Sequence, residues 1–172
     1  MSIRKKRFAI TIENAPALES LSFGNSTFTQ AGDLTLAGLD ALRTITADDH
    51  AFGEGNGTLT VRNCPALRVL QAGSFAFSGY TFLVVDATPA LEVIETGSFA
   101  FVDASLLNVT GFVSLVNLTV GANSFLGKNS RLLLSNCPRV EILRVGEESF
   151  SGDAESEFSD SLVLRSIHTR VL

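Results

Sequence analysis

The side chains that could act as bases, proton relays or metal ligands are few in this sequence. His50 and His168 are its two histidines, and histidine is the side chain that titrates near neutral pH. His50 directly follows Asp48 and Asp49, so this triplet is the one cluster that could ligate a metal or relay a proton. Because two carboxylates beside one histidine do not make a preorganised site, we interpret the triplet as a solvated corner of the chain.

Pairs of carboxylates offer a second kind of chemistry, the cleavage of glycosidic bonds, which needs two acids facing each other across the substrate. Glu13 and Asp86 are outward-facing acids, but they belong to distant repeats, and Glu95 stands alone in its outward column. Glu92 with Glu95 is the remaining candidate pair. We therefore expect no catalytic residues, no cofactor and no metal ion, and a protein that is not an enzyme.

Four asparagines each begin an Asn-x-Ser/Thr sequon, the acceptor motif for N-linked glycans in secreted proteins. They are Asn25, Asn56, Asn108 and Asn117. Serine and threonine are abundant in the chain, so these sequons leave the glycosylation state open.

The composition favours a folded domain and argues against nucleic acid as a partner. The chain has 172 residues, of which 45% are hydrophobic and 18% charged, which is enough to build a core. Its net charge is −5, and four of its 13 basic residues lie in residues 4–7, so nine bases face 18 acids elsewhere. An acidic body does not suit a polyanion. We interpret residues 1–7 as a basic, solvated N-terminal tail.

The same sequence shows neither a signal peptide nor an apolar run of the roughly 18 residues that a membrane helix needs. We expect a soluble chain without a membrane span. Its compartment is left open: the cell surface or the outside of the cell if the chain is part of a longer array, and the cytoplasm otherwise.

An internal repeat organises the whole sequence. Phenylalanine recurs every 24 or 25 residues, at Phe28, Phe52, Phe77, Phe101, Phe125 and Phe150. Repeats start near residues 10, 34, 59, 83, 107 and 132, and aliphatic residues hold the same positions in each. The four prolines share one position, and five glycines share another, with Asp48 in the glycine's place in the second repeat.

Each repeat contains two short segments in which apolar and polar residues alternate, such as Leu59–Val61 and Leu70–Ala72. A period of two predicts strands with one buried face. Proline lacks a backbone donor, and glycine tolerates unusual backbone geometry, so both suit the corners of a coil. We predict a mainly β repeat solenoid of about six 24-residue rungs whose stacked side chains form a continuous core, with a right-handed parallel β-helix as the alternative fold.

The repeat resembles the leucine-rich repeat. The segment Leu115–Phe125 matches the frame LxxLxLxxNxL, with phenylalanine in the last place. The other rungs replace the asparagine of this frame by Ser26, His50, Phe75, Phe99 and Glu148. The ending Gly-x-x-Ala/Ser-Phe, as in Gly73–Phe77, is similar to the BspA-type subfamily of bacteria and protists. Over about residues 8–164, this resemblance implies a protein-binding or scaffolding module, often at cell surfaces; the alternative fold implies a carbohydrate-active or carbohydrate-binding protein.

If the LxxLxL segment forms an exposed sheet, its outward side chains make the binding surface. They are small and polar in the early repeats and larger in the later ones, where apolar anchors lie beside charges. The residues expected to bind a protein partner are Val69, Gln71, Val93, Glu95, Asn117, Thr119, Ile142 and Arg144.

The same register makes predictions about contacts between rungs. Glu19 with Arg43, and Arg68 with Glu92, are expected to pair across adjacent rungs. Cys64 and Cys137 occupy the same column in the third and sixth repeats. About 14 Å should separate them, so we expect two buried, unbonded thiols.

The C-terminal part departs from the regular spacing. We predict that the solenoid spans 8–161, with a mobile acidic loop at 152–160, and that 162–172 is a truncated seventh repeat without its second strand. An open terminal rung exposes apolar surface and unpaired backbone groups. The chain is therefore expected to belong to a longer array or to associate end to end with itself.

Overall fold

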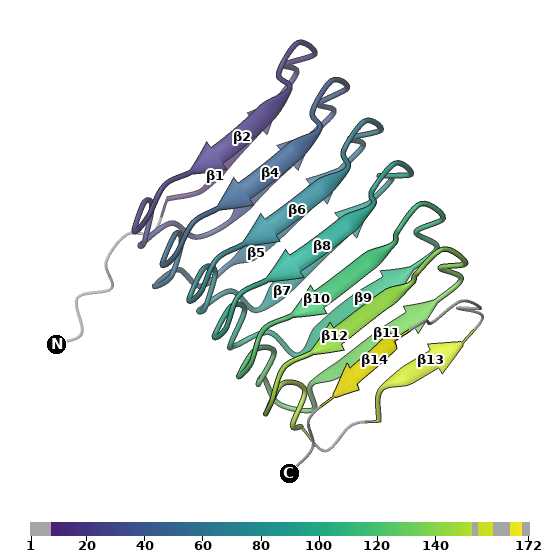
Figure 1. Cartoon of the computed structure of the whole chain (residues 1–172). Coiled ribbons are helices and arrows are strands. Elements are labelled where there is room, and N and C mark those ends of the chain that lie inside the picture. The colour runs from purple at the N-terminus through teal and green to yellow at the C-terminus, as the bar shows by residue number, and fades with distance from the viewer. Residues whose placement is uncertain (1–7, 153–154, 160–165, 170–172) are drawn as a thin grey trace, which may run out of the picture.

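The computed structural model describes residues 8–152 and 155–159, and the backbone of 166–169. These residues form a β solenoid with no helix, in which parallel strands repeat about every 24 residues and stack rung upon rung (Figure 1). The fold class predicted from the sequence is confirmed. The part of the chain described here contains no helix long and apolar enough to cross a membrane.

Even-numbered strands, the second of each rung, form one uninterrupted parallel sheet, which we call the even sheet. Its strands are β2 (Ser20–Phe23), β4 (Thr44–Ala47), β6 (Val69–Ala72), β8 (Val93–Thr96), β10 (Asn117–Val120), β12 (Ile142–Val145) and β14 (Ser166–Thr169). Partners along the sheet are equivalent residues of successive rungs, as in Leu70 opposite Ile94 and Ile94 opposite Leu118.

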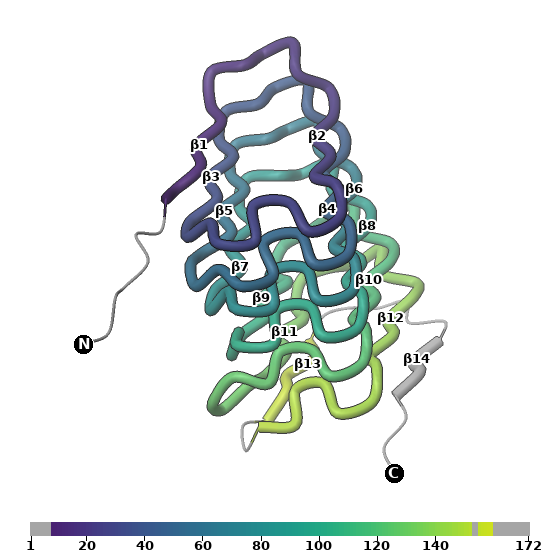
Figure 2. Tube along the Cα trace, turned by 90° about the vertical axis from the view of Figure 1, so that its left-hand side faces the viewer, coloured from purple at the N-terminus to yellow at the C-terminus, as the bar shows by residue number. Residues whose placement is uncertain are grey.

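Odd-numbered strands lie on the opposite side of the coil, as Figure 2 shows. They form two shorter sheets, one of β1, β3, β5 and β7, and one of β9, β11 and β13. Their bounds are β1 (Ile10–Glu13), β3 (Leu34–Ala37), β5 (Thr58–Arg62), β7 (Phe82–Asp86), β9 (Leu106–Thr110), β11 (Arg131–Ser135) and β13 (Glu157–Ser159).

The core lies between the sheets and is closed on the third side by phenylalanine. In β4, β6, β8 and β10 every second residue is buried, as the alternation predicts. The repeated phenylalanines stack along the axis with ring centroids 4.9 to 5.5 Å apart. Phe52 and Phe125 are fully buried. Stacked rungs therefore bury together what one rung could not bury alone.

Two kinds of corner explain the repeated small residues. The turn after each odd strand from β1 to β11 has one residue with positive φ, a conformation that Asn and Gly tolerate best. Asn63, Ala87 and Gly111 are examples, at φ 52°, 51° and 78°. The glycines after β6, β8, β10 and β12 are needed for space: a Cβ on Gly121, for example, would lie 2.3 Å from the carbonyl carbon of Gly97 in the preceding rung.

The seventh rung differs from the prediction. β13 pairs with β11, so residues 157–159 are a strand and not part of an acidic loop. β14 then pairs with β12, so this rung has a second strand, which the sequence did not predict. Leu134 pairs with Phe158, which lies 24 residues later. The residue 24 positions after Leu132 is Ser156, whereas the other repeats start with an aliphatic residue. For this reason the predicted start of the seventh repeat was 162. Residues 160–165 lie outside the described residues.

One interruption breaks the predicted continuous ladder. β7 and β9 are neighbours, but no strand pairing joins them in the part of the chain described. At their ends lies a hollow of about 180 Å³ lined by residues that include Thr88 and Phe112. These two side chains are consecutive members of one buried column, which holds cysteine in the third and sixth rungs. The bulky phenylalanine coincides with the point where the odd sheet splits.

Candidate interaction face

The outward face of the even sheet carries the residues that the sequence predicted as a binding surface. Strand alternation places them in two parallel columns, because every second residue of a strand points to the same side. One column holds Val69, Val93, Asn117 and Ile142, and the other holds Gln71, Glu95, Thr119 and Arg144. The structure thus brings all eight predicted residues onto one face.

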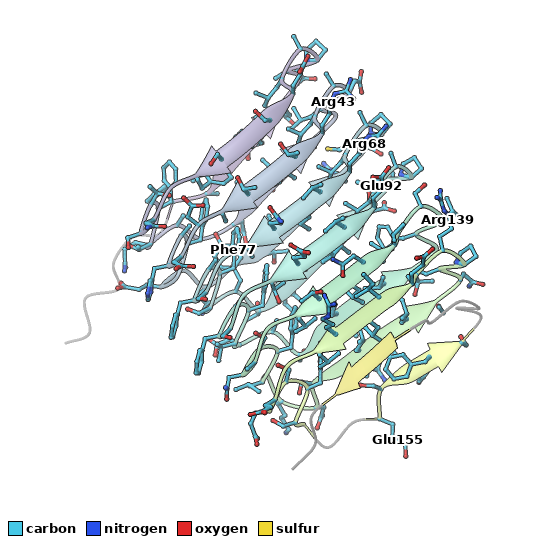
Figure 3. All side chains as sticks on the ribbon, in the orientation of Figure 1. Arg43, Arg68, Phe77, Glu92, Arg139 and Glu155 are labelled. Carbon is cyan, nitrogen blue, oxygen red and sulfur yellow. The ribbon has the colours of Figure 1, made fainter. Side chains whose placement is uncertain are left out.

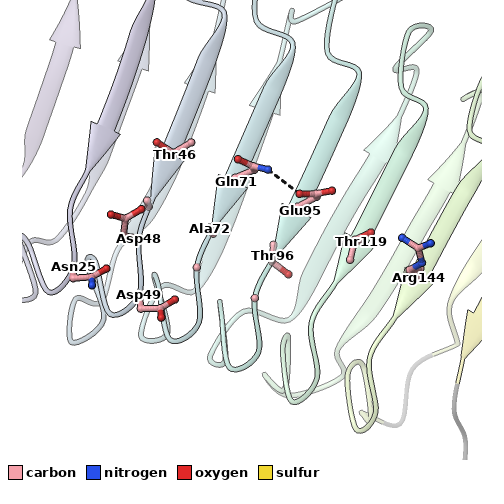
Figure 4. Close-up of a pocket in the computed structure, with 13 residues that line it drawn as sticks. Asn25, Thr46, Asp48, Asp49, Gln71, Ala72, Glu95, Thr96, Thr119 and Arg144 are labelled. Atoms are coloured by element: carbon pink, nitrogen blue, oxygen red, sulfur yellow. Dashed lines mark hydrogen bonds between the residues drawn. The ribbon is translucent and has the colours of Figure 1, made fainter.

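A hydrogen-bonded network fixes the polar side chains at the centre of this face. The Gln71 amide donates to Oε2 of Glu95, and the Asn117 amide donates to Oε1, both at 2.8 Å. The Thr119 hydroxyl in turn donates to Oδ1 of Asn117 at 3.0 Å. Glu95 therefore receives an amide from the rung on each side, which orients its carboxylate without a cation. Figure 4 shows the bond between Gln71 and Glu95.

A shallow groove of about 600 Å³ runs across the ends of these strands, from rung one to rung six. Asn25, Asp48 and Asp49 lie at one end and Arg144 at the other, as Figure 4 shows. The groove is therefore acidic toward the second rung and basic toward the sixth. Such an arrangement can bind an extended ligand through charge at both ends and amide contacts between them.

The apolar column beside the groove supplies the other half of the surface. Val69, Val93 and Ile142 are half-buried, and each is followed in its strand by a buried residue. Asn117 stands between Val93 and Ile142 in this column and gives its amide to the polar network. The two columns together offer apolar contact area next to oriented polar groups.

The predicted pairs between rungs are formed in part. Arg68 and Glu92 make an ion pair at 2.9 Å, and Figure 3 shows both on successive corner turns. Glu19 and Arg43 are linked through the backbone, where the Arg43 N–H donates to the Glu19 carbonyl at 2.8 Å. No side-chain ion pair joins them within the described residues. The Arg68 pair is exposed and contributes about 0 to 1 kcal/mol, so it helps to set the register and is not a site.

The Asp48-Asp49-His50 triplet is divided between two environments. Asp49 accepts the backbone N–H of Ser74 at 2.7 Å, and the His50 ring stacks on Phe75. Asp48 and Asp49 both line the groove. Across the described residues, no three side chains of His, Cys, Asp or Glu gather as they would around a metal ion. The side chain of His168 lies outside the described residues.

The structure also shows where the candidate catalytic carboxylates and the sequon asparagines lie. Glu13 and Asp86 lie at the ends of β1 and β7, three rungs apart, while Glu92 and Glu95 are engaged by Arg68 and by the two amides. Three sequon asparagines are exposed, and Asn117 is half-buried. The exposed ones are Asn25, Asn56 and Asn108.

One cluster had no functional interpretation in the sequence reasoning. His50, Phe75 and Phe99 form a second stack of rings on the third side of the coil, outside the buried phenylalanine ladder. The sequence does contain a sign of this cluster, because three successive rungs carry an aromatic ring at the asparagine position of the LxxLxLxxNxL frame.

Comparisons with known proteins gave no further assignment: no family model, no curated protein and no solved structure matches this chain.

Proposed function

We propose that the protein is a non-enzymatic binding or scaffolding module that holds a protein partner on the outward face of the even sheet. The observation that carries this proposal is the alignment of Val69, Val93 and Ile142 beside the oriented Glu95 network on one uninterrupted face. Apolar anchors next to satisfied polar groups are typical of protein interfaces.

The proposed partner is a polypeptide lying across several rungs. Contacts repeated along parallel strands add up over the length of the array, which suits an extended segment. The acidic body, with nine bases outside residues 4–7 against 18 acids, disfavours nucleic acid as the partner. We further propose membership of the BspA-type leucine-rich repeats, on the strength of the repeat frame alone.

Site-specific photo-cross-linking tests the proposed face. A photoreactive residue in place of Val93 on the even sheet should give protein adducts in cells of the source. The same residue in place of Thr60, which faces outward on an odd strand, is the matched control and should give none. Adding Ile142→Arg should reduce the Val93 adducts, because a charge then replaces an apolar anchor.

The two positions also provide the result that would contradict the proposal. Equal adducts from Val93 and Thr60, or Val93 adducts that persist unchanged in the Ile142→Arg chain, would remove the even-sheet face as the binding surface. Circular dichroism of each variant establishes that the fold is retained.

A further inference from the structure

The exposed ring stack occupies one turn position that recurs in rungs one to six. Its members all have positive φ between 55° and 60°, and are Ser26, His50, Phe75, Phe99, Asn123 and Glu148. The rings of His50 and Phe75 lie 4.8 Å apart at 3°, and those of Phe75 and Phe99 lie 4.7 Å apart at 4°. Three rungs thus present one rigid, parallel set of rings.

Exposure, and not backbone conformation, separates this stack from the largely buried phenylalanine ladder, whose members also have positive φ between 52° and 58°. Positive φ favours asparagine or glycine, and a bulky side chain there is strained. Phe75 and Phe99 also remain 39% and 37% exposed, so their rings are only partly removed from water. An exposed aromatic group is a feature that points to binding rather than to stability.

A hollow of about 470 Å³ lies at the N-terminal end of this stack. His50 and Phe75 line it together with residues of rungs one to three, which are Ser26, Thr29, Gly53, Glu54 and Ser78. The Gln30 amide donates to the Glu54 carboxylate, and the Ser78 hydroxyl donates to the Gly53 carbonyl. These bonds orient a carboxylate and one hydroxyl oxygen, both of which can still accept hydrogen bonds.

The stack of rings stops at His50, because the next member of the column is Ser26. One face of the imidazole meets Phe75, and on the other side the column offers only a short hydroxyl side chain. A planar group can therefore continue the stack over His50 beside Ser26. The Glu54 carboxylate only accepts hydrogen bonds, so it favours a group that donates them and carries a positive charge.

We propose that this hollow binds the guanidinium group of an arginine, stacked on His50 and paired with Glu54. Guanidinium is planar, always charged and rich in N–H donors, and it stacks on aromatic faces. A lysine ammonium cannot continue the stack, and a neutral sugar brings no positive charge to pair with Glu54. The site lies on the third side of the coil, away from the even sheet, and is independent of the function proposed above.

Titration of the full chain with small amides, followed by NMR of the His50 ring protons and the Phe75 amide, tests the site. N-acetyl-arginine amide should shift these signals saturably in the millimolar range. The citrulline amide, which is planar but neutral, and the lysine amide, which is charged but not planar, should each bind at least about tenfold more weakly. Free arginine is compared with its amide: preference for the amide indicates a peptide source, and preference for the free amino acid a metabolite.

Variants separate the two contacts. Glu54→Gln should weaken binding of the arginine amide about tenfold or more, because it removes the charge and keeps the shape. His50→Asn should abolish binding of the arginine amide, and the Phe75 amide signal is the probe because the His50 ring is absent. Asparagine tolerates positive φ, so this chain should fold. Asp103→Asn, in the turn two rungs further on, and Phe99→Asn, at the far end of the stack, are controls that should leave binding unchanged.

Several results would overturn the proposal. They are equal binding of the arginine and lysine amides, unchanged binding after Glu54→Gln, and no saturation by the arginine amide. Saturation of the same signals by methyl glucoside in place of the arginine amide would also overturn it, and would assign the hollow to a sugar.

Discussion

The environment of Tyr80 favours burial of its ring but not of its hydroxyl group. Its ring is fully buried against Phe77 and Phe52 and fills the space beside Gly55, where a Cβ would lie 2.6 Å from the tyrosine ring. Its hydroxyl is buried without a hydrogen-bond partner within the described residues. A buried polar group without a partner costs about 1 to 3 kcal/mol.

Replacing Tyr80 by phenylalanine should therefore stabilise the protein. Tyr80→Phe keeps the ring and removes the unpaired hydroxyl, so the free energy of unfolding should rise by about 1 kcal/mol in urea denaturation near neutral pH. Thr96→Val is the matched control, because the Thr96 hydroxyl is buried but lies 3.4 Å from the Gly121 N–H as a second acceptor, so its removal should not give the same gain. Loss of stability in Tyr80→Phe would mean that the hydroxyl has a partner.

The same residue links stability to alkaline pH. Burial, and next the nearby Asp33 charge, raise the pKa of Tyr80 above its ordinary value of 10.0. Because the folded pKa lies above the unfolded one, the stability that this group contributes is complete below about pH 10 and is lost as pH rises toward the folded value. The Tyr80→Phe chain should lose less stability above pH 10 than the parent, and parallel curves would contradict this origin.

Ala87 is another residue that costs free energy, in this case through its backbone conformation. Its φ is 51°, whereas equivalent corners use asparagine or glycine, as at Asn63 and Gly111. Left-handed backbone costs an alanine roughly 1 to 2 kcal/mol. Ala87→Asn should raise the free energy of unfolding by up to about 1 kcal/mol in thermal or urea denaturation. The exposed Ala17, which has no positive φ, is the control, and equal gains from Ala17→Asn would dismiss backbone strain as the cause.

Within a strand, alternation decides which substitution the fold tolerates. In β10, Leu118 is fully buried, and Thr119 is half-buried on the outward face. Leu118→Asp should unfold the chain, because an unpaired buried carboxylate costs several kcal/mol, comparable to the whole stability of a domain. Thr119→Asp should cost far less. Circular dichroism and urea midpoints distinguish them, and equal midpoints would refute the assignment of faces.

The break between β7 and β9 should be visible in hydrogen exchange. The N–H groups of Asn63 and Gly111 donate to the next rung, to Asp86 and Ser135 at 3.2 and 3.0 Å. The equivalent N–H of Ala87 has no such partner within the described residues. We expect the Ala87 amide to exchange faster than those of Asn63 and Gly111 in NMR measurements. Equal protection of all three amides would show that the rungs close up in solution.

For the whole molecule, the stacking of rungs fixes how far apart the cysteines lie. Cys64 and Cys137 are free and fully buried, as predicted, and they hold the same corner three rungs apart. Burial, the largest cause, raises the pKa of both thiols and so disfavours the reactive thiolate.

A thiol reagent should therefore find no reactive cysteine in the native protein and two after denaturation in urea. The measurement is absorbance with a chromogenic disulfide reagent, with the Cys137→Ala chain, which should give one thiol, as the control. A native chain with a disulfide would contradict the register of the solenoid, because three rungs separate the two corners by roughly 14 Å.

Much of this architecture follows from patterns that each rung carries in its own sequence. The 24-residue recurrence of Phe52, Phe77 and Phe101, together with alternation in segments such as 59–61, predicted the number of rungs, the two strands in each and the buried faces. The columns of the candidate face followed from the same register. A repeat is predictable in this way because every rung must satisfy the same packing and hydrogen-bonding requirements.

Where one rung departs from the others, only the tertiary structure decided the outcome. Ser156 occupies a position that is aliphatic elsewhere, and the pairing of β13 with β11 showed that the 24-residue step continues through it. The split beside Thr88 and Phe112, the two amides on Glu95, and the rings on His50 all depend on atoms from different rungs. The sequence by itself determined which residues share a column. Which of them touch depended on the sizes and orientations of side chains in adjacent rungs, because close packing is a property of several rungs together.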